Sequence, residues 1–321
     1  MKVIAILCSD LHLSHVPPTA RKAEPNWYAV MSRYLTQLRE LQNKHKCHVV
    51  CAGDIFDKWW GAHGKGSTEL INFAISELPK MYTVPGQHDL PYHSMKEIHK
   101  SAYWTLTQAG IIETIPHGIP KFLEVDNCHP IQGLVLHGLP WGFKIKPLAK
   151  KARVDVINLA VIHKYCWIPG HSYPGAELKG RVTKYRAALQ GYDAAVFGDN
   201  HKGFLSSTTK QKNKGTTVFN CGTFLRRAID EIAYKPQVGL LFEDGTVQSH
   251  FFDTSKDVFS SGKQIATTEI SDAAMEELLE ELKDIGDDPL SFASALDRYF
   301  KKERVPKAVK TILRKIMEES E

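Results

Sequence analysis

Five short segments of this 321-residue chain carry metal-binding side chains, and each follows an apolar run that is typical of a β-strand. Carboxylate, imidazole and carboxamide groups all bind divalent cations. Because open α/β sheets bind ligands at the carboxyl ends of their strands, we expect the five segments to meet at one site. They are Asp10-Leu11-His12, Gly53-Asp54, Gly86-Gln87-His88-Asp89, His163 and Gly198-Asp199-Asn200-His201. This set of ligands predicts a site for two metal ions.

The spacing within the segments suits that chemistry. Two divalent metals ~3.5–4 Å apart need a ligand that touches both, and the two oxygens of a carboxylate can do so. Asp54 suits the bridging role because Gly53 lets the backbone turn sharply and present the next side chain. Asp10 and His12 are two residues apart, so both face one side of an extended segment. This spacing predicts that Asp10 and His12 bind the same ion.

The apolar periodicity predicts the elements that position these residues. Helical spacing begins at Trp27 with Asn26 as its N-cap, and Asp244-Gly245 indicates a β-hairpin. We also expect the last three strands to be antiparallel to one another. The predicted strands are 2–8, 48–50, 81–85, 111–115, 121–126, 132–137, 154–163, 193–198, 215–221, 237–243 and 246–252. The predicted helices are 27–46, 67–78, 100–109, 145–153 and 181–190.

The character of the chain changes near residue 255. We predict a catalytic domain over residues 1–255 and a polar linker over 256–270. Apolar residues then recur at helical spacing, which predicts a C-terminal helical extension over residues 271–321. This extension either packs on its own domain or docks a partner protein.

Composition sets broad limits on the function. A hydrophobic content of 43% and a charged content of 24% are ordinary for a globular protein. The net charge of +5 permits a polyanionic partner without requiring one. We expect a cytoplasmic protein that does not bind a membrane, because the chain shows neither a signal peptide nor an apolar span of ~18–20 residues. The six cysteines form no CxxC pair and are expected to be reduced.

The five segments together resemble the calcineurin-like metallophosphoesterase superfamily, over roughly residues 1–255. The resemblance implies an α/β fold, a four-layer α/β/β/α sandwich that hydrolyses phosphate esters. It also implies two divalent metal ions, most often manganese, with magnesium or another divalent ion as alternatives. The first ion would be held by Asp10, His12, Asp54 and His201, and the second by Asp54, Gln87, His163 and Asp199. His88 would lie beside the phosphate as general acid or electrostatic stabiliser, and Asp89 would orient it.

Two positions depart from the usual pattern of the superfamily. Gln87 stands where asparagine is usual, so the same carboxamide sits on an arm one methylene longer. Asp199 stands where histidine is usual, and its hard oxygen favours manganese or magnesium over zinc. Its charge also offsets part of the attraction of the metals for phosphate. Alternatively, Asp199 lies outside the metal shell and the second ion is weakly held.

The motifs are most similar to the branch of the superfamily that contains the SbcD nuclease, including phage-encoded members. This likeness rests on Asp10-Leu11-His12-Leu13 and on Gly53-Asp54-Ile55-Phe56-Asp57, where Asp57 would orient metal ligands. It implies an exo- or endonuclease that cleaves DNA, in some members as a homodimer. An ATPase similar to SbcC would dock on residues 271–321. The alternatives are a phosphatase or phosphodiesterase for nucleotides or other small phosphoesters, and a non-catalytic scaffold subunit.

Several residues outside the motifs could contact a nucleic acid. Trp59 and Trp60 form a stacking platform for a base or else pack at the rim of the site. His137 is predicted to end a strand and line the site. Basic residues follow the last ligand and an earlier loop, and they form either a phosphate track or an ordinary solvated face. They are Lys202, Lys210, Lys212 and Lys214, with Lys144, Lys146, Lys150 and Lys151.

Overall fold

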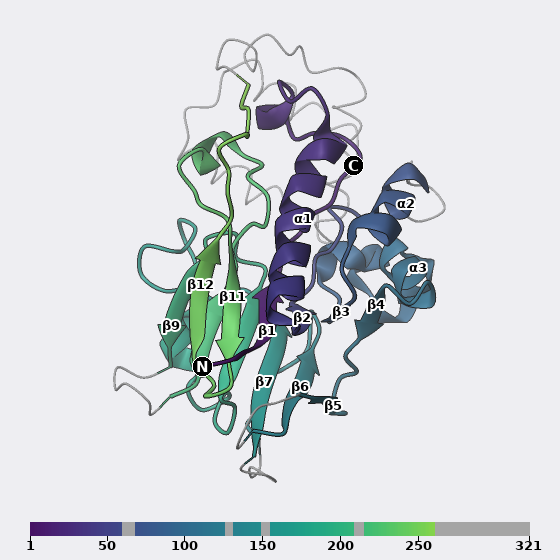
Figure 1. Cartoon of the computed structure of the whole chain (residues 1–321). Coiled ribbons are helices and arrows are strands. Elements are labelled where there is room, and N and C mark those ends of the chain that lie inside the picture. The colour runs from purple at the N-terminus through teal and green to yellow at the C-terminus, as the bar shows by residue number, and fades with distance from the viewer. Residues whose placement is uncertain (60–67, 126–130, 149–154, 209–214, 261–321) are drawn as a thin grey trace, which may run out of the picture. The chain divides into compact units, whose positions relative to one another are not determined.

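The computed structural model describes residues 1–59, 68–125, 131–148, 155–208 and 215–260, and they form two six-stranded mixed sheets (Figure 1). The first sheet has the order β12-β11-β1-β2-β3-β4, in which β1 to β4 are parallel and β11 is antiparallel to β1. Its strands are β1 Val3–Cys8, β2 His48–Cys51, β3 Met81–Thr83, β4 Ile112–Thr114, β11 Gln237–Phe242 and β12 Val247–Phe251. The parallel strands therefore bring the carboxyl ends of β1, β2 and β3 to one edge.

The second sheet has the order β5-β6-β7-β8-β10-β9, and its four inner strands are parallel. Its strands are β5 Lys121–Glu124, β6 Gly133–Leu139, β7 Val156–His163, β8 Ala194–Gly198, β9 Phe204–Ser207 and β10 Thr217–Asn220. The sequence analysis missed β9, a four-residue strand at the sheet edge. It was also wrong about β10, which runs parallel to β8 rather than antiparallel to the hairpin strands. Pairing with β8 satisfies the backbone of β10 inside this sheet.

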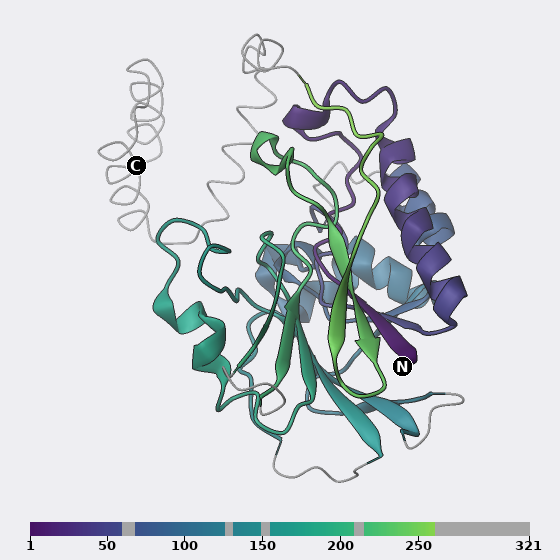
Figure 2. The ribbon, with the colours of Figure 1, turned by 60° about the vertical axis from the view of Figure 1, so that its left-hand side comes forward.

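Three helices cover the outer face of the first sheet (Figures 1 and 2). They are α1 Trp27–His45, α2 Thr68–Glu77 and α3 Ala102–Gln108. The side chain of Asn26 accepts a hydrogen bond from the Ala29 amide, which confirms the predicted cap of α1. α1 buries an apolar stripe that includes Met31 and Leu35. This stripe joins the core between helices and sheets.

The two sheets pack on each other through one core. On β7, Ile157, Leu159 and Val161 face this core together with residues of β1 and β2, while Ala160 and Ile162 join a second cluster on the other face. The second sheet is therefore buried on both faces, as parallel sheets usually are. This architecture confirms the predicted α/β sandwich.

The outer cover of the second sheet differs from the prediction. Residues 181–190 form a 3₁₀ turn at Val182–Tyr185 followed by further turns, where an α-helix was predicted. Arg181 precedes that turn and provides no side-chain cap, and the Val182 amide donates to the carbonyl of Trp167 at 2.9 Å instead. Residues 145–148 are also not helical, and the rest of the predicted helix at 145–153 lies outside the described residues.

The chain leaves the catalytic domain along a segment that is tied to it. Asp257 and Ser260 are buried, and Arg21 donates hydrogen bonds to Asp257 and to the carbonyl of Val258. The first residues of the predicted linker at 256–270 thus contact the domain. The predicted helical extension at 271–321 lies outside the described residues, and the division of the chain at 255 stays a prediction. Within the described part, no helix is long and apolar enough to span a membrane. The cysteines described there are all free thiols.

Candidate active site

The two sheets bring the five predicted segments together at the carboxyl ends of β1, β2, β3, β7 and β8. Hydrogen bonds join the segments directly: the Asp10 amide donates to the Gly53 carbonyl at 3.0 Å, and the Asp199 amide donates to Asp10 Oδ1 at 2.9 Å. His163 Nδ1 donates to the carbonyl of Ala52 at 2.5 Å, which ties the end of β7 to the end of β2. The candidate site is therefore a junction between sheets.

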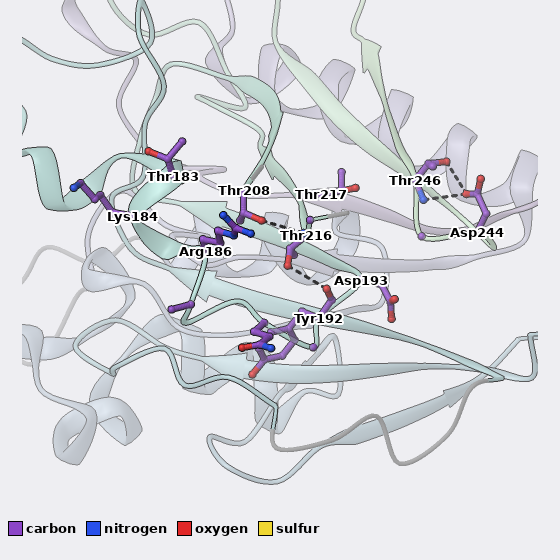
Figure 3. A pocket seen from close by; sticks show the side chains of 15 residues that line it. Thr183, Lys184, Arg186, Tyr192, Asp193, Thr208, Thr216, Thr217, Asp244 and Thr246 are labelled. Atoms are coloured by element: carbon purple, nitrogen blue, oxygen red, sulfur yellow. Dashed lines mark hydrogen bonds between the residues drawn. The ribbon is translucent and has the colours of Figure 1, made fainter. Parts of the chain in front are cut away.

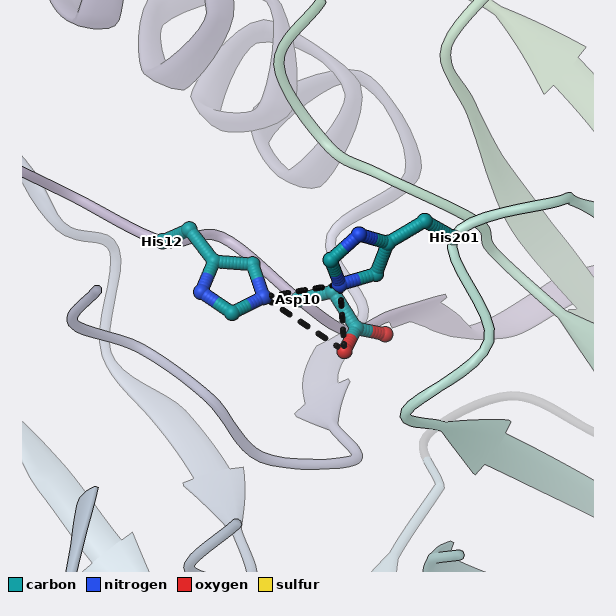
Figure 4. A group of neighbouring side chains, drawn as sticks. All are labelled: Asp10, His12 and His201. Atoms are coloured by element: carbon teal, nitrogen blue, oxygen red, sulfur yellow. Dashed lines mark hydrogen bonds and ion pairs between the residues drawn. The ribbon is translucent and has the colours of Figure 1, made fainter. Parts of the chain in front are cut away.

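One group of ligand atoms consists of Asp10, His12 and His201 (Figure 4). Their side chains point toward one another from the two sheets. His12 Nε2 lies 3.0 Å from His201 Nε2, and these nitrogens lie 3.8 and 3.9 Å from Asp10 Oδ1. These three residues belong to the predicted first metal site. The structure brings them within the reach of a single cation.

Asp54 lies between the two halves of the site. Its Oδ2 is 3.8 Å from His12 Nε2 on one side and 3.3 Å from His163 Nε2 on the other. Asp54 therefore belongs to one possible ligand group with His12 and His88 and to another with Asp10 and His163. This is the position that a bridging carboxylate requires.

The residues predicted for a second metal also lie together. Gln87 Oε1 is 2.5 Å from His163 Nε2, and Gln87 Nε2 donates to Asp199 Oδ1 at 2.9 Å. The longer arm of Gln87 thus reaches the same place as His163 and Asp199. These contacts show proximity, while the ligand roles of Gln87 and Asp199 stay predictions.

His88 forms one possible ligand group with His12 and Asp54. Its Nδ1 donates to the carbonyl of Asp57 at 2.8 Å, and its ring packs edge-on against His12 with centroids 5.0 Å apart. Asp89 is predicted to orient His88, and its carboxylate accepts hydrogen bonds from backbone amides rather than from the His88 ring. The donors are the amides of Asp54, Ile55, Phe56 and Gly86. Asp89 therefore holds the loop that carries Asp54.

Asp57 contacts several site residues, as its predicted orienting role requires. Its Oδ1 lies 3.5 Å from His12 Nδ1, while its carbonyl holds His88. Metal-binding histidines usually direct their second ring nitrogen to a carboxylate or carbonyl in this way. His163 follows that pattern through the carbonyl of Ala52, and His12 Nδ1 faces Asp57 without a hydrogen bond. Each ring thus keeps its Nε2 directed into the site.

The backbone at the site adopts conformations that most residues avoid. Asp10, His12, Asp54 and Asp199 all have φ between +43° and +80°. Such left-handed residues are strained and gather at functional sites. Gly86 is required for a different reason, since a Cβ there would lie 2.1 Å from Asp54 Oδ1. The strand-end loops are therefore shaped around the Asp54 carboxylate.

The electrostatics of the cluster suit a bound cation. Burial lowers the pKa of His12. Burial also lowers the pKa of His201, to about 3, and the neighbouring His12 adds to this shift. Both imidazoles are therefore neutral at pH 7 and have lone pairs to offer. Burial raises the pKa of Asp10 to about 7, and the charge of Asp54 adds to this. Burial also opposes ionisation of Asp54, but the neighbouring His163 outweighs it and lowers the pKa of Asp54.

The residues fit the divalent metals that the fold implies. Asp10 Oδ2 and Asp54 Oδ2 are fully buried and make no hydrogen bond. Leaving buried carboxylate oxygens unpaired is costly unless a partner such as a metal satisfies them. Carboxylate oxygens with imidazole nitrogens form a suitable donor set for manganese, magnesium or zinc.

His137 is a predicted site residue that lies elsewhere. β6 continues to Leu139, so His137 sits inside the strand and pairs with Ala160, three residues before the end of β7. Its Nε2 bonds to Asn158 Oδ1, and its ring packs edge-on against Tyr192. The prediction that His137 lines the site is therefore wrong.

The predicted substrate-binding residues are only partly described. Trp59 packs against Tyr92, which follows the His88 loop and is 62% exposed. Lys202 donates to the carbonyl of Ser172 and lies over the ring of Tyr173. Lys144 and Lys146 are exposed. The remaining predicted contacts, Trp60, Lys150, Lys151, Lys210, Lys212 and Lys214, lie outside the described residues.

The sequence analysis missed Arg227, whose Nη2 donates to Asp57 Oδ1. The same oxygen lies 3.5 Å from His12 Nδ1. Arg227 stands in a loop after β10 and outside every motif, so local sequence carried no signal for it. Its place at the site depends on a contact across 170 residues of chain.

A groove of about 1020 Å³ lies at the opposite end of β8 from the ligands (Figure 3). Residues before β8 and at the start of β10 line it, together with the hairpin turn between β11 and β12. Its lining includes Arg186, Tyr192, Asp193, Thr216 and Asp244. We assign the active site to the strand-end cluster, because the groove lacks the converging ligands that the chemistry needs.

This chain belongs to the calcineurin-like phosphoesterase family, whose sequence model matches residues 5–203. No curated protein sequence matches it. Among solved structures it is similar to the calcineurin-like phosphoesterase YfkN from Bacillus subtilis, with 14% identity and a TM-score of 0.44 over 86% of this chain and 97% of that one. It is also similar to the sulfate thiohydrolase SoxB from Thermus thermophilus, with 10% identity and a TM-score of 0.46 over 90% of this chain and 63% of that one.

Proposed function

We propose that this phosphoesterase is a metal-dependent nuclease that cleaves phosphodiester bonds of DNA. The observation that carries the hydrolytic part is the convergence of Asp10, His12, Asp54, His163 and His201 at the strand ends. Buried carboxylate oxygens without hydrogen bonds support metal binding at this point. When bound, divalent cations supply a nucleophilic water at neutral pH and offset the charge of the phosphate.

The protein groups have distinct parts in this reaction. Asp10, His12, Asp54 and His201 would hold one ion, and Asp54 with Gln87, His163 and Asp199 would hold the other. His88 would act as the general acid and donate a proton to the leaving oxygen from Nε2, because Nδ1 is engaged by the Asp57 carbonyl. Asp89 acts through the backbone by fixing the loop of Asp54. Manganese is the preferred ion in this proposal because of the carboxylates.

Three features support DNA as the substrate. The motif around Asp54 and Asp57 is similar to the SbcD nuclease branch. Trp59 and the exposed Tyr92 could stack on a base, and Lys202 could approach a backbone phosphate. Docking of an ATPase on residues 271–321 and homodimer formation stay predictions.

The test is cleavage of end-labelled single- and double-stranded DNA with manganese, beside bis(p-nitrophenyl) phosphate. We expect metal-dependent loss of label that falls at least ~10²-fold in the His88→Ala variant. His99→Ala is the matched control, because His99 is exposed on a 3₁₀ helix and contacts none of the ligands. Hydrolysis of the small ester without cleavage of DNA would instead favour a phosphodiesterase or phosphatase for small substrates. A protein that binds metal weakly and hydrolyses neither would be a scaffold.

A further inference from the structure

Two adjacent arginines after β10 have opposite surroundings. Arg226 is buried, and its guanidinium donates to Asp257 and to the carbonyls of Ile232 and Thr254. Its own carbonyl accepts a hydrogen bond from Arg21. All these partners belong to the protein. Arg226 is therefore a structural anchor that fixes the position of the next residue.

Arg227 extends from that anchor to the active site. Its Nη2 donates to Asp57 Oδ1, the oxygen that also lies 3.5 Å from His12 Nδ1. Because Asp57 also lies beside His12, this hydrogen bond holds the guanidinium at the edge of the first ligand group. Glu231 accepts hydrogen bonds from the amides of Arg227 and Ala228 and holds this backbone in place.

The guanidinium of Arg227 does not use all of its N–H donors for contacts within the described part of the protein. Its Nε is buried and makes no hydrogen bond, while the side chain as a whole is 21% exposed. An arginine presents five N–H donors in a planar fork that matches the oxygens of a phosphate. A fixed cation with spare donors at the edge of a metal cluster is suited to an anionic substrate.

We propose that Arg227 binds the substrate through a non-bridging oxygen of its phosphate group, with Asp57 holding the guanidinium in position. This inference rests on the proposed phosphoesterase function but not on the choice of DNA. It makes Arg227 a substrate-binding residue for any phosphate ester, because a non-bridging oxygen is common to all of them. No bond is made or broken by Arg227 itself.

The rival role is purely structural: Arg227 neutralises Asp57 and thereby supports His12 as a metal ligand. The two roles predict different losses. A phosphate-binding residue changes the affinity for phosphate when the metal site is saturated. A structural partner of Asp57 changes the affinity for the metal and leaves phosphate binding at saturating metal unaltered.

The first experiment is isothermal titration calorimetry of the full chain with manganese and then with inorganic phosphate at saturating manganese. We expect Arg227→Gln to weaken phosphate binding about 10–100-fold, the usual range for a charged hydrogen bond, with manganese affinity within a factor of about 3. Arg227→Lys should recover part of the loss, because it keeps the charge but not the fork. Arg186→Gln is the matched control, since Arg186 is exposed and lines the distant groove.

The second experiment measures hydrolysis of bis(p-nitrophenyl) phosphate with and without added guanidinium ion. The Arg227→Ala variant should lose kcat/KM about 10–100-fold and regain part of it when guanidinium is added. Unchanged phosphate affinity, or a loss confined to manganese affinity, would overturn the proposal. If the wild type cleaves the aryl ester but not DNA, the proposed nuclease function fails while the assignment of Arg227 stands.

Discussion

Two buried carboxylate clusters in this protein satisfy their charges in opposite ways. Asp257, whose side chain is only 1% exposed, accepts hydrogen bonds from Arg21 at 3.3 Å, Arg226 at 2.9 Å and the Tyr34 hydroxyl at 2.6 Å. Although burial favours its neutral form, the Tyr34 hydrogen bond and the charge of Arg21 outweigh this and lower the pKa of Asp257. The protein thus provides every cation that Asp257 needs.

The strand-end cluster leaves carboxylate oxygens without hydrogen bonds, although His163 lies 3.3 Å from Asp54. Asp10 and Asp54 are fully buried, and each has an oxygen without a hydrogen bond. Burial raises the pKa of Asp10 to about 7, the opposite direction from Asp257. Both clusters are buried, so burial alone does not identify a functional carboxylate. The informative feature is a buried carboxylate oxygen that makes no hydrogen bond, because such an oxygen needs a partner from outside the chain.

Replacing Asp54 should have the largest effect on catalysis. Asp54 belongs to two of the ligand groups, so Asp54→Asn removes the charge that both halves of the site share. We expect a loss of ~10³-fold or more in the manganese-dependent hydrolysis of bis(p-nitrophenyl) phosphate, the scale of losing a major electrostatic group.

Glu113→Gln provides the matched control for Asp54→Asn. Glu113 pairs with Lys121 on the surface, and its side chain is 53% exposed. Its removal should leave the rate unchanged. If Asp54→Asn kept more than about a tenth of the wild-type activity, Asp54 would not be the shared ligand of the site.

Replacing Asp257 should instead reduce stability. The Asp257→Ala variant removes the carboxylate that Arg21 and Arg226 share, and of these two arginines Glu24 remains a partner of Arg21 alone. Breaking a buried pair from one side costs about 3–5 kcal/mol, and we expect that loss in the free energy of unfolding by urea. Glu113→Gln should cost less than about 1 kcal/mol, as exposed pairs do. An equally small cost for Asp257→Ala would mean that the arginines are satisfied without it.

The strand-end cluster could be predicted from the sequence to a large extent. The strand-end ligands were predictable because each lies next to the apolar run that positions it, as Asp10 follows β1 and His163 ends β7. Parallel pairing then brings these ends together without any further information. The local pattern therefore contained both the ligand and its approximate place.

Contacts between distant segments were not predictable. Arg227 meets Asp57 across 170 residues and Asp257 meets Arg21 across 236, and neither pair follows a local pattern. His137 was misplaced because β6 extends two residues further than its sequence suggests. The direction of the Asp89 side chain depended on how the Asp54 loop packs, which alternation along a strand does not determine.

Adding metal should sharpen the difference between the clusters. A ligand that binds only the folded protein stabilises it by about 2.7 kcal/mol at a concentration of 100 times Kd. For a domain of this size the melting temperature should rise by about 5–10 °C with manganese. The Asp257→Ala variant should show the same rise from a lower starting point, whereas Asp54→Asn should show little or none. An equal rise in Asp54→Asn would place the bound ion outside the cluster.

The smallest effect expected is a change in the acid dependence of stability. The pKa of Asp257 is lowered in the folded protein, so its contribution is complete above the unfolded value of 3.8 and is lost as the pH falls through the folded value. One proton contributes at most about 1.4 kcal/mol per pH unit. The free energy of unfolding in chelator should therefore fall less steeply between about pH 5 and pH 3 in Asp257→Asn than in wild type. Parallel curves would show that Asp257 titrates alike in the folded and unfolded chains, which its buried arginines should prevent.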